Sequence, residues 1–578
     1  MLKILKISLL ALLAVVTSAS CTDSGEEGGA NKPLVVWPEQ IEFPAEGGEE
    51  LVTVTCEAVT PEVSCDSAWV KAEIKFDLSQ AVHNRYKVRV KCLPNTTRGR
   101  REAMVSISTR EAQRYVKVSQ TFEQDGTITT DKLQVDLDMG GGDFDLVVNS
   151  AYAFTVKTPD WITVADDGSR SAFSYTERFT AQPNISYEQR SGEIVFTQID
   201  DTTQTAVVKV SQQCAVSKNA LEVAREINVG WNLGNSLEIP TGETSWNNPA
   251  TTQKTIDGVY AAGFNAVRIP CAWNSYLVED AEPYTIKPAW IARVKEVVDY
   301  CYNKGMYVYL NCHWDGGWLE EHANAASMPL VNKKQRAIWT QIANAFADYD
   351  YHLIFAGANE VRENNNWGKP NGEQLTAQQS YMQTFVDAVR ATGGLNAKRV
   401  LAVQTYCANP ERVFDYGFKL PEDPTGKGYL MLEFHCYNPQ TYTGITRQTQ
   451  RFWGNRMGYS DSRIQQEDYF DDLFLRLRRM FTNSQYINIP LVLGEYGVGL
   501  HAENSNPTTD AKIRLCEAYY YEYLTKCAKD HGIVPFTWDN GSTEVGQFGK
   551  IDRVTGNVTK PYLIEGIMKG AAEGHYPF

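Results

Sequence analysis

Eight short apolar segments alternate with helical segments over about the last 360 residues, and this alternation most constrains the fold. The apolar segments are 227–233, 266–269, 307–311, 353–356, 401–404, 431–435, 491–494 and 534–538. Between them, 291–304 and 335–348 carry apolar residues at the three- and four-residue spacing of an amphipathic helix. Eight such units predict a (β/α)8 TIM barrel over residues 216–578.

The chain before this barrel contains an internal repeat. The pentapeptide Val-Lys-Val-Ser-Gln begins at Val116 and again at Val208, 92 residues later, and Trp69 and Trp161 have the same separation. An Asn followed by an Arg recurs at an offset of 89, as Asn95 with Arg101 and Asn184 with Arg190. Both copies alternate apolar and polar residues at period two. We therefore expect two immunoglobulin-like β-sandwiches, over 33–125 and 126–215.

The repeated unit resembles the BACON domain of Bacteroidetes. The features that carry the resemblance are the central Trp, the Asn-to-Arg segment and the final Val-x-Val-x-Gln strand. That resemblance implies either a carbohydrate-binding module or a spacer. Trp69 and Trp161 stand next to apolar residues at matching places, which favours packing against the core over sugar binding.

The first residues have the layout of a secretory signal. Lys3 and Lys6 precede an apolar run at 7–16, and small residues lead to Cys21. This pattern resembles a lipoprotein signal over 1–21 with acylation of Cys21, although Ser18 stands where Leu is usual; the alternative is a plain signal-peptidase site. Residues 22–32 form an acidic tether, similar to a surface-export signal. We expect an outer-membrane lipoprotein exposed at the cell surface.

The net charge of −15 argues against nucleic acid or an anionic membrane surface as a partner. The chain has 12 cysteines, and an odd number remains when Cys21 is set aside. No CxxC pair occurs, so a structural zinc site is not expected. Disulfides among Cys56, Cys65 and Cys92 are possible but not predicted. We expect a monomer.

Polar and aromatic residues stand where the predicted barrel strands end, the position of the active site in this fold. They are Arg268, His313, Asn359, Glu360, His435, Tyr437, Glu495 and Trp538. Glu360 and Glu495 end strands four and seven, roughly opposite each other across the mouth. Cleavage of a glycosidic bond needs one protonated and one ionised carboxyl group, and this pair supplies them.

The neighbouring residues have the chemistry to support this pair. Arg268 and Tyr437 could hold one carboxylate ionised, and His435 lies two residues from Tyr437, hence on the same strand face. Asn359 could bind a sugar 2-hydroxyl, and Trp538 offers a flat surface for a pyranose ring. No cluster has the spacing of metal ligands, so no metal and no organic cofactor is expected.

These motifs resemble glycoside hydrolase family 5, the cellulase family of retaining (β/α)8 enzymes. The pair Asn359-Glu360 matches its acid/base motif, and Glu495 in Gly-Glu-Tyr-Gly matches its nucleophile. The opening at 230–238 and the segment 243–249 look like subfamily 4, which contains endo-β-1,4-glucanases, xyloglucanases and mixed-linkage glucanases. Val361 replaces the usual Pro, and Trp314 replaces a usual His, which puts subsite preference in doubt.

The resemblance implies a retaining endo-β-1,4-glucanase acting on a plant β-glucan. Xyloglucan is the first expectation, followed by mixed-linkage glucan and amorphous cellulose. The alternatives are a non-catalytic surface glycan-binding protein on the same scaffold and an endo-β-mannanase. Several loop aromatics could stack on sugars or could pack in the core: Trp246, Trp314, Trp318, Trp273, Trp367, Tyr406 and Trp453.

Overall fold

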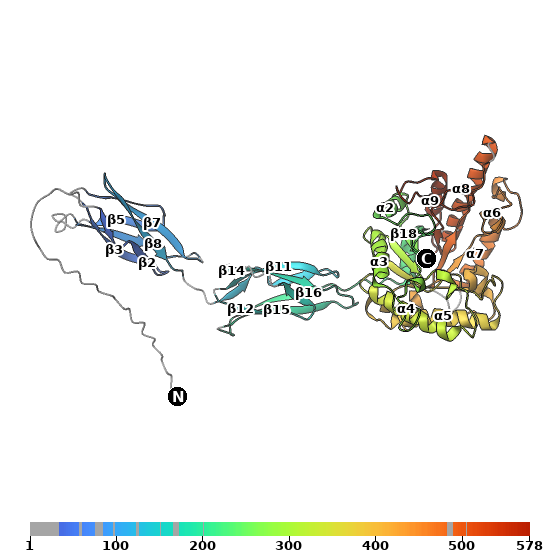
Figure 1. Ribbon diagram of the computed structural model, residues 1–578, viewed down its shortest axis with the longest axis horizontal. Helices are drawn as coiled ribbons and strands as arrows, with labels where there is room; N and C mark the ends of the chain where they lie inside the picture. The colour runs from blue at the N-terminus through green and yellow to red at the C-terminus, as the bar shows by residue number, and fades with distance from the viewer. Residues whose placement is uncertain are drawn as a thin grey trace, which may run out of the picture.

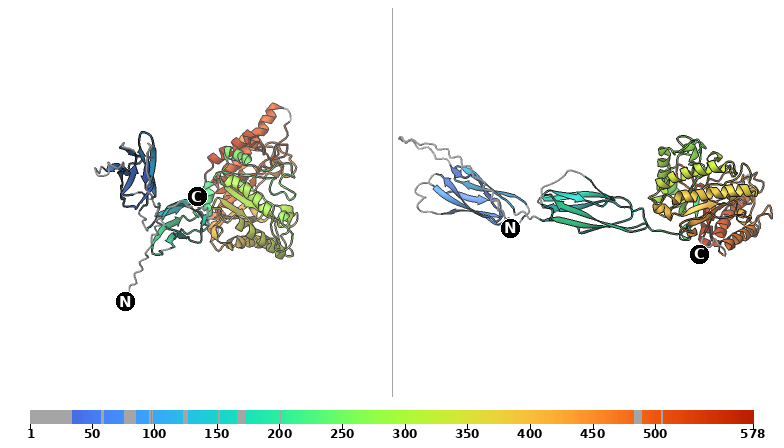
Figure 2. Two further views of the ribbon diagram at one scale, coloured as in Figure 1. Left: turned by 60° about the vertical axis from the view of Figure 1, so that its left-hand side comes forward. Right: turned by 90° about the horizontal axis from the view of Figure 1, so that it is seen from below.

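The structure, a computed structural model, describes residues 34–578 except 57–59, 76–84, 96, 98, 123–126, 151, 166–172, 200, 483–488 and 504–505. Two β-sandwiches are followed by a barrel, and the three parts lie in a row (Figures 1 and 2). The predicted signal with Cys21 and the tether lie outside the described residues. Within the described ranges, no helix has the length and apolar character needed to cross a membrane.

The two β-sandwiches predicted from the repeat are present, and each consists of two four-stranded sheets. In the first, the strand orders are β1-β3-β6-β5 and β2-β8-β7-β4, with β1 Val35–Trp37, β2 Gln40–Phe43, β3 Gly48–Thr55, β4 Glu62–Cys65, β5 Val70–Lys75, β6 Arg85–Cys92, β7 Arg101–Ser108 and β8 Gln113–Gln120. In the second, they are β10-β16-β15-β12 and β13-β14-β11-β9, with β9 Ile128–Thr130, β10 Gln134–Leu137, β11 Gly142–Ser150, β12 Phe154–Lys157, β13 Ile162–Ala165, β14 Phe173–Ala181, β15 Arg190–Gln198 and β16 Thr205–Gln212.

The repeated residues meet in space, which explains why they recur together. Arg101 lies over the ring of Trp69 at 4.3 Å and donates through Nε to the side-chain oxygen of Gln120 at 2.9 Å. Arg190 makes the same two contacts in the second sandwich, with Trp161 at 4.5 Å and Gln212 at 2.8 Å. Both Trp side chains are partly buried against the sandwich cores. The expectation of core packing is thereby confirmed.

The barrel is a closed ring of eight parallel strands. They are β17 Gly230–Asn232, β18 Ala266–Ile269, β19 Tyr307–Asn311, β20 Leu353–Ala356, β21 Leu401–Gln404, β22 Leu430–His435, β23 Leu491–Tyr496 and β24 Ile533–Thr537. The helices are α1 Ala220–Glu226, α2 Gln253–Ala261, α3 Pro288–Tyr302, α4 Met328–Ala345, α5 Gly372–Arg390, α6 Gln440–Thr443, α7 Glu467–Thr482, α8 Pro507–Asp530 and α9 Pro561–Glu573. The predicted first strand began too early, because Ile227 caps α1 instead.

The inside of the barrel changes from apolar to polar along the strands. Ala266, Met431 and residues of α1 belong to one buried cluster at the end where the strands begin. Two residues further along the same strands, on the same face, stand Arg268 and Glu433, both fully buried. The polar layer therefore lies at the carboxyl end of the barrel, where a TIM barrel carries its active site.

The second sandwich contacts the opposite end of the barrel. The Tyr187 hydroxyl donates to the carbonyl of Leu395 at 2.9 Å, and Lys398 lies 4.9 Å from the Tyr187 ring. Leu395 belongs to the short helix η4, Gly394–Ala397, which connects α5 to the start of β21. This contact therefore lies away from the mouth.

None of the 11 cysteines at the described positions is in a disulfide, so no disulfide joins Cys56, Cys65 or Cys92. Nine of them, including Cys56 and Cys92, are buried, where a thiol acts as a small apolar side chain.

Candidate active site

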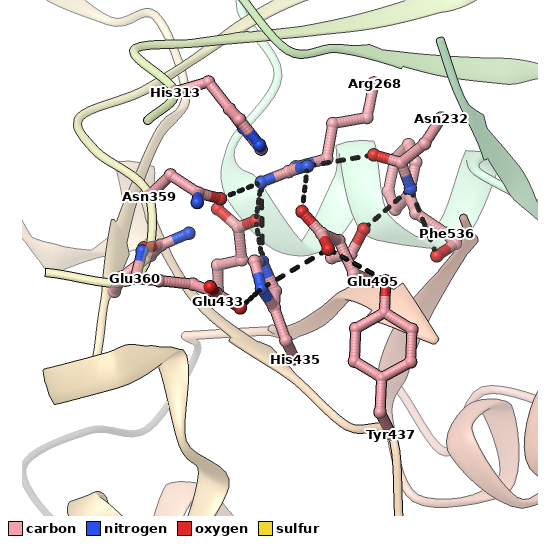
Figure 3. A network of polar contacts seen from close by, with 12 residues as sticks. Asn232, Arg268, His313, Asn359, Glu360, Glu433, His435, Tyr437, Glu495 and Phe536 are labelled. Carbon is pink, nitrogen blue, oxygen red and sulfur yellow. Dashed lines mark hydrogen bonds and ion pairs between the residues drawn. The ribbon is translucent and has the colours of Figure 1, made fainter. Parts of the chain in front are cut away.

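Glu495 is held at the end of β23 by donors to both of its carboxylate oxygens. Arg268 donates to Oε1 at 2.8 Å, and the hydroxyl of Tyr437 donates to Oε2 at 2.9 Å (Figure 3). Burial raises the pKa of Glu495, while the positive charges of His435 and Arg268 and the Tyr437 hydrogen bond oppose that rise. These partners favour an ionised carboxylate, as a nucleophile requires.

A bulge in β23 turns Glu495 into this position. Phe434 pairs with Leu493, but the next residue, His435, pairs with Glu495, so Gly494 is an extra residue on β23. A Cβ on Gly494 would lie 2.2 Å from Oε1 of Glu433. Glycine precedes Glu495 because the buried Glu433 side chain occupies that space.

His435 connects the two candidate catalytic carboxylates. Its Nδ1 lies 2.8 Å from Oε1 of Glu360, and its Nε2 lies 3.1 Å from Oε1 of Glu433. A carboxylate oxygen on each side requires both ring nitrogens to donate. Although burial acts in the opposite direction, the charge of Glu495 and the bonds to Glu360 and Glu433 raise the pKa of His435 to about 10. The ring is therefore an imidazolium.

Glu360 follows β20 on a turn with φ of 42°, an uncommon value for a residue with a side chain. Its backbone N–H donates to the side-chain oxygen of Gln404 at 2.8 Å, which holds the turn. Its side chain is 21% exposed, against 8% for Glu495, so solvent protons reach Glu360 more readily. Glu360, His435 and Glu495 each place one oxygen or nitrogen within 4.8 Å of the others. An imidazolium has no lone pair for a metal ion, so this triad favours proton chemistry.

Asn359 is fixed from both sides of its amide. Its Oδ1 accepts from Arg268 at 3.0 Å, and its Nδ2 donates to Glu320 at 3.1 Å. Glu320 lies in the segment after β19 and is itself paired with Arg362. Burial, and then the charge of Glu360, raise the pKa of Glu320 to about 8, against the opposing effects of Arg362 and Asn359. One Asn359 N–H remains to contact a sugar hydroxyl.

His313 and Trp538 stack on each other at the mouth, with ring centres 6.0 Å apart and planes 10° apart. Nδ1 of His313 lies 3.1 Å from the amide nitrogen of Asn311, which can only donate, so the ring proton is on Nε2. Burial and the charges of Arg268 and His435 lower the pKa of His313, which is neutral. Gly234 makes room for Trp538, because a Cβ there would lie 2.6 Å from the indole ring.

The loop aromatics divide into two groups. Trp246 and Trp314 are 43% and 36% exposed, with ring centres 6.4 Å apart, and Trp367 is exposed beneath Arg362 at 4.1 Å. Trp318 is partly buried against the barrel core. Trp273, Tyr406 and Trp453 are fully buried, so for them the alternative of core packing holds and sugar stacking is excluded.

Three polar residues at this site are not among the sequence-predicted set: Asn232, Glu320 and Glu433. Asn232 accepts from Arg268 at 2.9 Å and donates to the Gly494 carbonyl at 2.9 Å. Glu433 is an acid between apolar residues of the strand Leu430–His435, and that contrast is a signal visible in the sequence. Glu320 stands beside a second acid, Glu321, and in sequence looks like a solvated loop.

A closed (β/α)8 barrel with two acidic side chains converging at its carboxyl end defines the glycoside hydrolase class of barrel enzyme. The sequence profile of the Cellulase family, glycosyl hydrolase family 5, matches residues 232–544, over half of the chain. The chain belongs to glycosyl hydrolase family 5. The BACON profile, which describes a binding domain, matches residues 151–213 in the second sandwich.

Known relatives agree with this assignment. Endoglucanase A of Paenibacillus barcinonensis is 34% identical over 374 residues, covering 61% of this chain and 90% of the relative. The xyloglucan-specific endo-beta-1,4-glucanase BoGH5A of Bacteroides ovatus is 34% identical over 364 residues, covering 61% and 70%. A solved family 5 xyloglucanase of Bacteroides ovatus covers 93% of this chain and 100% of its own, at 26% identity and a TM-score of 0.56. A xyloglucan-specific β-1,4-glucanase from a ruminal metagenomic library covers 62% and 98%, at 35% identity and a TM-score of 0.56.

Proposed function

We propose that this chain is a retaining endo-β-1,4-glucanase in which Glu495 is the nucleophile and Glu360 the acid/base. One observation carries the proposal: oxygens of the two carboxyl groups lie within 4.8 Å of each other. A retaining pair is about 5–5.5 Å apart, whereas an inverting pair leaves room for a water molecule at about 6.5–9.5 Å.

The environments of the two groups suit two successive displacements. Glu495, held by Arg268 and Tyr437, attacks the anomeric carbon while Glu360 gives its proton to the departing oxygen. Glu360, now ionised, removes a proton from water, which attacks the glycosyl ester and releases Glu495. The free N–H of Asn359 is suited to a hydrogen bond with the sugar 2-hydroxyl in both transition states.

Xyloglucan is the proposed first substrate, followed by mixed-linkage glucan and amorphous cellulose. Support comes from the relatives BoGH5A and the ruminal enzyme, whose names specify xyloglucan. The exposed Trp246 and Trp314 at the mouth offer apolar ring surfaces suited to a chain of β-linked glucose units.

The test is product release from xyloglucan, mixed-linkage glucan, carboxymethylcellulose and glucomannan, with proton NMR of the first anomer formed. We expect oligosaccharides from xyloglucan, released first as the β-anomer, and no release by Glu495→Ala. Release from none of these polymers would support a glycan-binding protein instead. Preference for glucomannan would indicate a mannanase, and a first α-anomer would contradict the retaining mechanism.

We also propose that the protein is a monomeric lipoprotein of the outer membrane, facing outward, with the sandwiches as spacers. The sequence around Cys21 and the contact of Tyr187 with the end of the barrel away from the mouth support this arrangement. Labelled palmitate should be incorporated into the wild type but not into Cys21→Ser. Protease added to intact cells should degrade the enzyme. A Cys21→Ser variant that still takes up label would refute the anchor.

A further inference from the structure

Glu433 is a third carboxylate of the site, and the two-displacement reaction described above gives it no part. It is fully buried on β22, two residues before His435. Its Oε1 lies 3.0 Å from Nη2 of Arg268 and 3.1 Å from Nε2 of His435 (Figure 3). Its Oε2 accepts from the Tyr309 hydroxyl at 2.7 Å. The contacts with Arg268 and His435 join Glu433 to the residues that bind the reacting carboxylates, and the contact with Tyr309 fixes the Glu433 side chain in place.

We propose that Glu433 is a positioning residue whose single oxygen bridges Arg268 and His435 and keeps His435 an imidazolium beside the permanently charged Arg268. The inference deepens the proposed function and rests on it. Arg268 in turn holds Glu495 and Asn359, and His435 holds Glu360. One buried charge thus fixes the partners of both reacting groups.

The separation of the two cations shows why a bridging anion is needed. Nη2 of Arg268 lies only 3.4 Å from Nε2 of His435. Two positive charges at that distance in a buried site repel each other strongly. Without the Glu433 oxygen between them, the imidazolium would lose a proton more easily, and the ring would present a lone pair to Arg268 instead of an N–H to a carboxylate.

Charge balance gives the bridge a second consequence. The cations Arg268 and His435 together with the anions Glu433 and Glu495 form a neutral set. The proton on Glu360 that the first displacement needs can then be kept without a net buried charge. When Glu495 becomes a neutral glycosyl ester, the set gains one positive charge, which favours the anionic Glu360 that the second displacement needs.

The ionisation of Glu433 is consistent with this role. Burial raises its pKa, but Arg268, His435 and the Tyr309 hydroxyl oppose burial and together lower the pKa to about 2. The charged and titratable groups that face His435 come from five strands or the segments that follow them: Arg268, His313, Glu360, Glu433, Tyr437 and Glu495. Among these, Glu433 is the carboxylate that takes no part in bond making.

The decisive variant is Glu433→Gln, which keeps the shape and removes the charge. We expect kcat on a soluble xyloglucan oligosaccharide to fall on the order of 10²-fold, the effect of a small displacement of catalytic groups, with little change in KM. The alkaline limb of the kcat profile should move to lower pH. In nitrogen NMR, the imidazolium signal of His435, assigned by its loss in His435→Asn, should persist above pH 8 in the wild type and titrate below pH 8 in the variant.

Glu517→Gln is the matched control, because Glu517 also pairs with a buried histidine, His501, at 3.0 Å, yet has no contact with the reacting carboxylates in the described structure. It should leave kcat and the His435 signal unchanged. If Glu433→Gln does not fold, Glu433→Asp, which keeps the charge, must retain the imidazolium signal above pH 8. A folded Glu433→Gln with wild-type kcat and an unchanged signal would overturn the proposal. The NMR measurement needs no turnover. A wild type that is inactive would therefore refute the proposed function without deciding against the role of Glu433, which the imidazolium signal tests separately.

Discussion

The two candidate catalytic carboxylates are held by different kinds of structure. Glu495 lies within a strand, and its donors, Arg268 and Tyr437, come from β18 and the segment after β22. Glu360 lies on a turn after β20, is more exposed, and takes one side-chain bond from His435. We refer to these as the nucleophile side and the acid/base side.

The contrast follows from what each group must do. A nucleophile has to stay ionised and aimed at one carbon, so neighbouring strands provide fixed donors and exclude water. An acid/base has to exchange a proton with solvent in every cycle, which full burial would prevent. The barrel therefore places one group inside its polar layer and the other on the rim. The predictions below test this contrast, beginning with the largest expected effect.

Glu495→Ala should abolish the reaction, with kcat/KM reduced by at least about 10⁴-fold, because no other group can form the glycosyl ester. The loss should be equally severe on polysaccharide and on a dinitrophenyl β-glycoside. Added azide should attack the anomeric carbon directly and yield the α-glycosyl azide. A β-glycosyl azide from this variant would show that Glu495 and Glu360 have the opposite roles.

Glu360→Ala should lower kcat on polysaccharide by about 10²–10⁴-fold, the usual contribution of a general acid. On a dinitrophenyl β-glycoside the first displacement should be nearly normal, because that leaving group needs no proton. Azide should accelerate turnover and yield the β-glycosyl azide, since it attacks the glycosyl ester. An equal loss on both substrates would contradict the role assigned to the acid/base side.

On both sides, the residues that stand where the barrel strands end could be predicted from sequence. Strand periodicity placed Arg268, His435 and Glu495 at strand ends, because each follows a short apolar run. Glu433 was not predicted, although an acid between apolar residues of a strand is visible in the sequence. The change from apolar to polar within the barrel depends on the closed ring of strands, which local patterns do not specify.

Glu320 could not be found in this way. It reaches Asn359 because the segments after β19 and β20 are tied together, for example by the N–H of Arg362 donating to the Glu320 carbonyl at 2.6 Å. Loop-to-loop contacts of this kind have no periodicity. For the same reason Trp273 and Trp453 could not be distinguished from Trp246 before the structure placed them in the core.

Glu320→Gln should reduce kcat about tenfold, close to the value of one hydrogen bond that positions Asn359. Glu321→Gln is the control, because Glu321 also pairs with Arg362, at 2.9 Å, but does not bond to Asn359. The control should keep wild-type kcat. Equal losses in both variants would mean that Arg362, and not Asn359, carries the effect.

The same variant should change how stability depends on pH. The pKa of Glu320 in the folded protein is about 8, against an ordinary value of 4.5, so the folded state binds its proton more tightly. Its contribution to stability is therefore complete below about pH 4.5 and is lost as pH rises towards 8. The difference in unfolding free energy between wild type and Glu320→Gln, from denaturant titrations, should fall from pH 5 to pH 8. A difference that stays constant would contradict the raised pKa.

The smallest effect is expected far from both sides, at the contact between the second sandwich and the barrel. Tyr187→Phe keeps the ring beside Lys398 but removes the hydrogen bond to Leu395. Because η4 precedes β21, the change lies at the end of the barrel where strands begin, and the apolar layer containing Met431 separates it from Glu433. We expect kcat/KM on a soluble oligosaccharide to stay within about twofold, since sites without shared partners are usually independent. A tenfold loss would mean that the sandwich influences the mouth, and that the contrast between the two sides does not depend on the barrel alone.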